Sequence, residues 1–132
     1  MKKTFDFLLI LTAIYITSCQ KSATPSSLGH ATVEYKTSIS SVVTFYAYYS
    51  DQDEQFVSYE GMPLTGSTWT RQFIAEETNF KDAKMTLYFQ GTPPFQVTSQ
   101  ILVNGVVKES VNSTFKNYVD TLTLEDPNVW AN

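Results

Sequence analysis

Three carboxylates fall within one short polar stretch, at Asp51, Asp53 and Glu54. Oxygen ligands at alternate positions are an arrangement that suits Ca²⁺. A calcium loop of the EF-hand type needs glycine at its sixth position, where this chain has Phe56. The stretch therefore favours a solvated turn. Its three carboxylates are candidate calcium ligands, but we expect no metal site.

Residues that could support catalysis are scarce. His30 is the only histidine and Cys19 the only cysteine, so a nucleophile has few partners to activate it. The chain has no Gly-x-Ser-x-Gly elbow and no glycine-rich phosphate loop. Glu76, Glu77 and Asp82 lie in a charged link, which favours a solvated loop over an acid–base pair. We expect no enzyme activity, no catalytic residue and no cofactor.

Tyrosines are the residues best placed to bind a partner. In the run 42–49, Tyr46 and Tyr48 alternate with a more apolar set, namely Val43, Phe45, Ala47 and Tyr49. We place the apolar set inward, so that the two tyrosines point outward from one face of a strand. Tyr59 and Tyr88 on other predicted strands can join them. Outward aromatic rings stack on sugars or anchor a protein partner, unless the tether, a loop or sheet-edge packing covers them.

The elements that position these tyrosines are strands. Short runs of β-branched and aromatic residues alternate with polar residues and are separated by turn residues. We predict strands at 33–38, 42–49, 55–60, 69–74, 84–90, 96–103, 106–110 and 118–124. Asn104-Gly105 is the strongest hairpin signal, because both residues of a type I′ turn need positive φ. We expect 61–67 to be a loop and 76–82 to carry at most one helical turn.

This spacing predicts an all-β fold. Seven or eight antiparallel strands in a domain of this size are typical of an immunoglobulin-like two-sheet β-sandwich, with a single closed barrel as the main alternative. Trp69 is predicted to lie in the core, since a sandwich usually buries one tryptophan. Trp130 follows the last strand and either caps one end of the domain or is free.

The N-terminus is typical of a targeting signal. Lys2 and Lys3 precede a mostly apolar run over 7–16, about half the length that crosses a bilayer. The next residues, Ile-Thr-Ser-Cys at 16–19, resemble the lipobox of bacterial lipoproteins. The resemblance implies cleavage before Cys19 and acylation of that residue, which anchors the chain in a membrane. An ordinary secretory signal with a chance cysteine is the alternative.

These features divide the chain into three parts. A lipoprotein signal peptide covers 1–18, the lipidated cysteine and a flexible tether cover 19–29, and the β-sandwich domain covers 30–132. The tether is rich in serine, threonine and proline and has no acidic residue. Some surface-exposed lipoproteins of Bacteroidetes-type bacteria carry acidic residues directly after the cysteine. Their absence here favours the periplasmic side of the outer membrane.

Composition limits the partners. Hydrophobic residues make up 42% of the 132 residues, which excludes a disordered tail. With a net charge of −4, the chain lacks the excess of basic residues that nucleic-acid-binding proteins carry. A single cysteine excludes an internal disulfide.

Three segments follow one another at a spacing known from one family. They are Val-Glu-Tyr at 33–35, Trp-Thr-Arg-Gln-Phe at 69–73 and Gln-Ile-Leu-Val-Asn-Gly-Val-Val-Lys-Glu at 100–109. Together they resemble the MmpS family, the small mycobacterial membrane proteins that accompany MmpL lipid and siderophore exporters. The resemblance implies an immunoglobulin-like β-sandwich and a non-enzymatic envelope role. Ser99 stands where family members often carry a cysteine, and a lipobox replaces their transmembrane helix, so small Gram-negative lipoproteins are the nearer comparison.

The expected function is that of a non-catalytic, lipid-anchored protein of the cell envelope. It would act as a binding, adaptor or transport-accessory module, with the membrane and an envelope complex or transporter as partners. The alternative is a carbohydrate-binding domain that uses the exposed tyrosines to hold a glycan.

Overall fold

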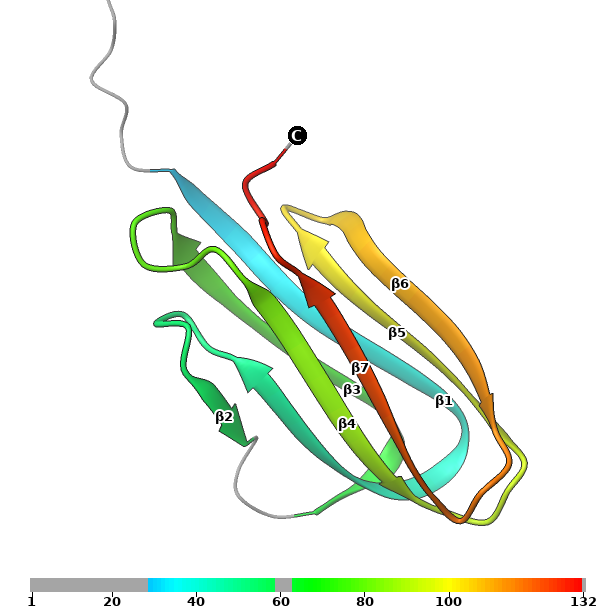
Figure 1. Cartoon of the computed structure of the whole chain (residues 1–132). Coiled ribbons are helices and arrows are strands. Elements are labelled where there is room, and N and C mark those ends of the chain that lie inside the picture. Colours follow the sequence, from blue (N-terminus) through cyan, green and yellow to red (C-terminus); the bar gives the residue numbers. More distant parts are fainter. Residues whose placement is uncertain (1–28, 59–62, 132) are drawn as a thin grey trace, which may run out of the picture.

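The computed structural model describes residues 29–58 and 63–131 (Figure 1). Every strand in this part of the chain runs antiparallel to its partners. The strands are β1 (His30–Ser50), β2 (Phe56–Ser58), β3 (Leu64–Glu76), β4 (Ala83–Gln90), β5 (Phe95–Val103), β6 (Val106–Phe115) and β7 (Val119–Asp126).

β1 is the central strand of the fold. Its first half, up to Ile39, lies between β3 and β5. Its second half pairs with β4 on one side and with β2 and the start of β3 on the other. The register with β3 shifts between Ser38 and Val43, at the place where β1 bends (Figure 1). The two strands predicted at 33–38 and 42–49 are therefore the two halves of one bent strand.

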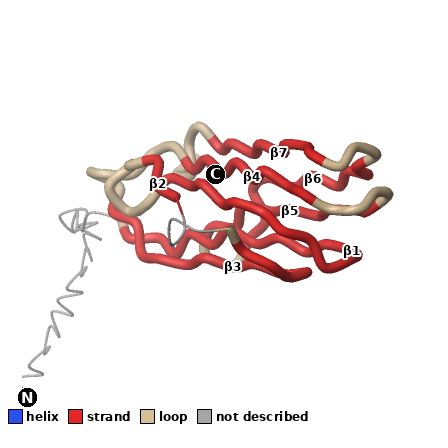
Figure 2. The backbone as a smooth tube through the Cα atoms, turned by 90° about the horizontal axis from the view of Figure 1, so that it is seen from below, coloured by secondary structure: helices blue, strands red, loops and turns tan. Residues whose placement is uncertain are grey.

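The bend in β1 decides the architecture. Because β1 pairs on both sides of its bend, hydrogen bonds join the described strands into one sheet of order β6-β5-β1-β4-β7, with β2 and β3 also on β1. The sheet curls until its outer strands β6 and β7 lie close together, which gives a nearly closed, barrel-like shape (Figure 2). The predicted all-β antiparallel fold is confirmed. The sheet is continuous through β1, so the barrel alternative describes its hydrogen bonding better than two separate sheets.

The core fills the inside of the curl. Side chains alternate along each strand, and the inward set predicted for the run 42–49 is confirmed: Val43, Phe45, Ala47 and Tyr49 are buried. Trp69 is buried too, as predicted. In the described part of the chain the buried apolar residues lie between Ala31 and Val129, so a chain without residues 1–18 retains this core.

The predicted turn between β5 and β6 is confirmed, while the start of β3 differs from the prediction. Asn104 and Gly105 have φ of 51° and 78° and join β5 to β6, as the hairpin signal predicted. β3 begins at Leu64, inside the predicted loop 61–67, because it pairs there with the second half of β1. The link after β3 contains one helical hydrogen bond, from Phe80 N–H to the Glu76 carbonyl.

Some predictions fall outside the described residues. These are the signal peptide, Cys19, the tether before Gly29, and Tyr59. Within the described ranges, no helix is both long enough and apolar enough to cross a membrane.

Candidate functional site

The candidate site is a cluster of aromatic side chains on the outer surface of the sheet, formed by Tyr46, Tyr48, Phe56 and Tyr88. We call it the aromatic face. Burial of the odd-numbered residues of β1 turns its even-numbered residues outward. The register then places Tyr46 opposite Tyr88 on β4, and Ser50, two residues beyond Tyr48, opposite Phe56 on β2.

Tyr48 is the centre of the aromatic face. Its ring contacts two rings from other strands. The ring centroid of Tyr88 on β4 lies 5.5 Å away, edge to face, and that of Phe56 on β2 lies 6.1 Å away, stacked. Such pairs are worth about 0.5–1.5 kcal/mol beyond the area they bury. Tyr88 and Phe56 remain 45% and 50% exposed, so the cluster is held in place and still presents apolar surface.

A shallow groove of about 310 Å³ adjoins the cluster. Its lining includes Tyr46, Tyr48, Tyr88, Gln90 and Val119, the last of these at the start of β7. Val119 is 58% exposed, which extends the apolar surface from β4 onto β7. The Gln90 side chain supplies an uncharged polar group beside the rings.

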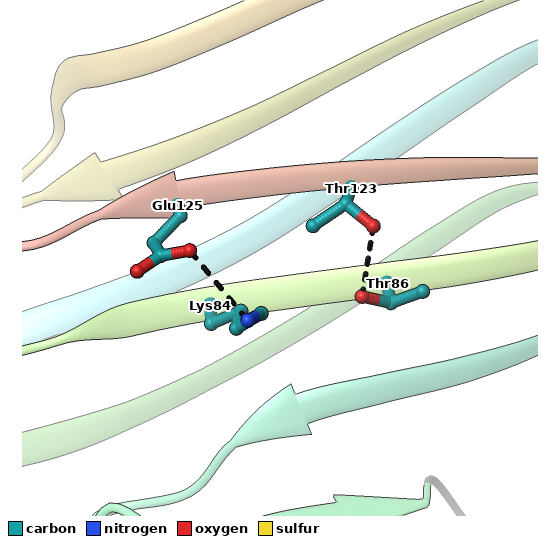
Figure 3. A network of polar contacts seen from close by, with 4 residues as sticks. All are labelled: Lys84, Thr86, Thr123 and Glu125. Carbon is teal, nitrogen blue, oxygen red and sulfur yellow. Dashed lines mark hydrogen bonds and ion pairs between the residues drawn. The ribbon is translucent and has the colours of Figure 1, made fainter.

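Polar pairs border the aromatic face across β4 and β7 (Figure 3). The hydroxyl oxygens of Thr86 and Thr123 lie 3.1 Å apart. Lys84 and Glu125 form an ion pair with an N–O distance of 3.6 Å, and both side chains are substantially exposed. Because these charges have opposite sign and face each other, this border adds little net charge to the surface.

The structure brings together three of the four tyrosines singled out from the sequence. Tyr46, Tyr48 and Tyr88 share one surface, while Tyr59 lies outside the described residues. Phe56 also belongs to this surface and was missed as a site residue. Its place depends on the pairing of β2 with the end of β1, and a run of only three strand residues gives no sequence signal for that register.

The turn at 51–55, whose carboxylates are the candidate calcium ligands, is held in place by hydrogen bonds that backbone N–H groups donate to Asp51 and Glu54. Asp51 Oδ1 accepts hydrogen bonds from the backbone N–H groups of Asp53 (3.0 Å) and Gln55 (2.9 Å). The Glu54 carboxylate accepts backbone N–H bonds from Lys81 and Asp82. Within the described ranges, His, Cys, Asp and Glu form no group of three that could hold a metal ion. Asp51 and Glu54 therefore have a structural role in this turn.

The carboxyl group of Asp82 lies at one end of the barrel, next to this turn. Burial raises its pKa, and the nearby carboxylates of Glu125 and Glu54 raise it further, while Lys84 acts in the opposite direction. One of its oxygens, Oδ1, is buried without a hydrogen-bond partner. Among the described residues, Asp82 is not part of the lining of the groove beside Tyr88.

Comparison with known proteins finds no matching family and no matching curated protein.

Proposed function

We propose that this protein is a non-catalytic, lipid-anchored module of the cell envelope that binds a protein partner through the aromatic face. The observation that carries the proposal is the cluster of Tyr48, Tyr88 and Phe56, whose rings are fixed against one another yet remain partly exposed. Tyrosine is one of the residues most often found at the energetic centre of protein interfaces.

The anchor in this proposal is Cys19, with the chain held at the periplasmic side of the outer membrane. Its support is the lipobox-like sequence at 16–19 and the preceding apolar run. Replacing Cys19 with Ala is expected to move the protein from the membrane fraction to the soluble periplasmic fraction. Retention of that variant in the membrane fraction would contradict lipid anchoring.

An adaptor or transport-accessory role belongs to the same proposal, and so does the immunoglobulin-like, MmpS-like relationship. Its support is the hairpin at 100–109, which forms with the turn that its sequence predicts, and the strands that carry the other two segments of resemblance. In this role the anchored domain would hold an envelope complex or transporter close to the membrane.

Site-specific photocrosslinking tests the partner directly. A photoreactive phenylalanine analogue is placed at Tyr88 in the full-length protein in its native envelope, with Thr114, an exposed residue of β6, as the control position. We expect one discrete protein adduct from position 88 and none from position 114. Identical adducts from both positions, or none from position 88, would remove the aromatic face as the interface.

Variants show whether the rings provide the binding surface. Tyr88→Ala is expected to abolish the adduct formed from a photoreactive group at Phe56, while Tyr88→Phe retains it because the ring stays in place. Tyr118→Ala is the matched control, because Tyr118 is 63% exposed but does not belong to the aromatic face.

A second candidate is carbohydrate binding. The specific observation in its favour is the uncharged Gln90 amide beside Tyr46 and Tyr48 in the groove, since rings and neutral hydrogen-bonding groups together suit a sugar. Glycan binding by the fragment 20–132 is compared with that of a Tyr46→Ala/Tyr48→Ala variant. Binding that depends on both tyrosines would support this candidate, and equal binding by the two proteins would remove it.

A further inference from the structure

The chain enters the described domain at one end of the barrel, and the C-terminal segment finishes at the same end (Figure 1). The Gly29 carbonyl accepts a hydrogen bond from Glu77 N–H at 2.9 Å. Trp130 lies against Gly29, because a Cβ atom built on that glycine would be 3.3 Å from the indole ring. Residues 20–28 separate Gly29 from Cys19, so the tether spans at most about 35 Å even when fully extended.

This end of the barrel carries exposed apolar side chains. Ile74, Val106 and Val107 are 67%, 61% and 45% exposed. Ile74 pairs with Thr32, near the start of β1. The two valines follow the β5–β6 turn, which is fixed to the same place by a hydrogen bond from Asn104 N–H to the Thr32 carbonyl (2.8 Å). We call the surface formed by Gly29, Ile74, Val106, Val107 and Trp130 the tether end.

Trp130 gives the tether end its chemistry. The indole is half-buried, and its N–H donates a hydrogen bond to the Phe80 carbonyl. Beside it a groove of about 430 Å³ is lined by Val106, Lys108 and Trp130, among other residues. Tryptophan with an apolar surface and a lysine at its edge is the combination that proteins place at the boundary between lipid headgroups and acyl chains.

We propose that the tether end rests on the bilayer surface, with Trp130 and the exposed aliphatic residues at the level of the headgroups. This inference depends on the lipid anchor of the proposed function. Acidic residues at this end favour a zwitterionic surface over an anionic one. They are Glu76 and Glu77 at and directly after the end of β3, together with Glu54, Asp82 and Glu125 around the loop that holds Trp130.

The opposite end of the barrel is a poorer membrane surface, although Val42 and Tyr118 are exposed apolar residues. β5 alone spans nine residues between the two ends, about 30 Å. For the far end to touch the bilayer, the tether would have to run back along the whole barrel and would use nearly all of its reach. With the tether end down, the strands stand away from the membrane and the aromatic face is open to the periplasm.

Quenching of tryptophan fluorescence by brominated lipids tests this orientation, because the chain contains only Trp69 and Trp130. The chain from Cys19 to Asn132 retains the whole described core and is coupled through its single thiol to a maleimide lipid in phosphatidylcholine vesicles. Coupling fixes the anchor chemically, so a failed orientation is distinguished from a failed lipidation, which the Cys19→Ala fractionation reports separately.

In the Trp69→Phe background we expect brominated acyl chains to quench Trp130 by about twofold or more, as for an interfacial indole. The control carries Trp69→Phe, Trp130→Phe and Tyr118→Trp, and its indole at the far end is expected to keep its fluorescence. Equal quenching of the two proteins, no quenching of Trp130, or stronger quenching at position 118 would each overturn the proposal. If Trp69→Phe unfolds the protein, the wild-type chain is compared with Trp130→Phe, which supplies the signal of buried Trp69 alone.

Discussion

The side-chain oxygens of Thr37 and Ser99 lie 2.9 Å apart in the core, at a point where neither residue reaches solvent. The two residues are direct partners across β1 and β5, and the Thr37 hydroxyl also contacts the Met85 sulfur on β4 at 3.9 Å. The two hydroxyls therefore hydrogen-bond to each other inside a mainly apolar interior, which explains why the barrel tolerates two polar side chains at this point.

Removing one of these hydroxyls is expected to destabilise the fold. Ser99→Ala leaves the Thr37 hydroxyl with only a sulfur acceptor and should lower the free energy of unfolding by about 1–3 kcal/mol. Thr37→Val should do the same for Ser99. The double variant should lose less than the sum, because replacing both partners removes the unsatisfied group. Urea unfolding of all four proteins measures this coupling, and strictly additive losses would contradict it.

Glu54 joins two loops that are far apart in sequence. Its carboxylate accepts the backbone N–H groups of Lys81 and Asp82. Glu54→Ala removes this acceptor and is expected to cost about 1–3 kcal/mol of stability, measured by thermal or urea unfolding. Asp53→Ala is the matched control, since the Asp53 side chain is exposed in the same turn and should change stability little.

Backbone geometry adds a second test at the same position. Glu54 has a φ of 58°, which glycine adopts without steric cost. Glu54→Gly should therefore destabilise the protein less than Glu54→Ala, although both lose the carboxylate. A larger loss for the glycine variant would contradict a steric cost of positive φ at this position.

Asp82 is expected to make stability depend on pH. Its pKa in the folded protein is raised above the unfolded value, mainly by burial. Protonation of Asp82 thus stabilises the fold at acidic pH, and this contribution is lost as the pH rises through the folded-state pKa. Asp82→Asn should be more stable than the wild type at neutral pH, with the difference shrinking as the pH falls toward 3.8, the ordinary carboxyl value.

Unfolding midpoints measured from acidic to neutral pH check this behaviour. Glu109→Gln is the control, because it removes one negative charge from an exposed position on β6. A stabilisation by Asp82→Asn that stays constant across the pH range would show that titration of Asp82 is not its cause.

Replacing Gly91 with a larger residue is expected to destabilise the fold. A Cβ atom at this position would lie 2.6 Å from Cγ1 and 3.0 Å from Cβ of Val43, which is buried. Gly91→Ala should therefore cost about 1–3 kcal/mol, measured by urea unfolding. Gly66→Ala is the control, since the nearest atom to its Cβ would be 3.8 Å away. Adding Val43→Ala should reduce the penalty of Gly91→Ala, and failure to do so would rule out this clash.

Local patterns in the sequence were sufficient for much of the fold. Alternation along 42–49 assigned Val43 and Phe45 to the core and Tyr46 and Tyr48 to the surface, and the structure confirms this. The Asn104-Gly105 turn was also predictable, because positive φ is a property of those residues themselves. The burial of Trp69 was expected because a β-sandwich usually buries one tryptophan, and Trp69 is buried in the structure.

Other features depended on contacts between distant residues. No local signal shows that β1 continues through its bend and pairs on both sides, so two strands were predicted where one exists. The structural use of Glu54 was equally hidden, because its partners Lys81 and Asp82 lie in another loop. Phe56 joined the aromatic face only through the register of β2.

The sequence by itself determined the strand character of the chain, the inward and outward faces of its strands and the turn between β5 and β6. These depend on side-chain alternation and on backbone preferences that act over a few residues. Only the tertiary structure decided that one sheet curls into a barrel-like shape and that Tyr48, Tyr88 and Phe56 meet on one surface. The physical reason is that strand pairing and register arise from hydrogen bonds and packing between segments far apart in the chain.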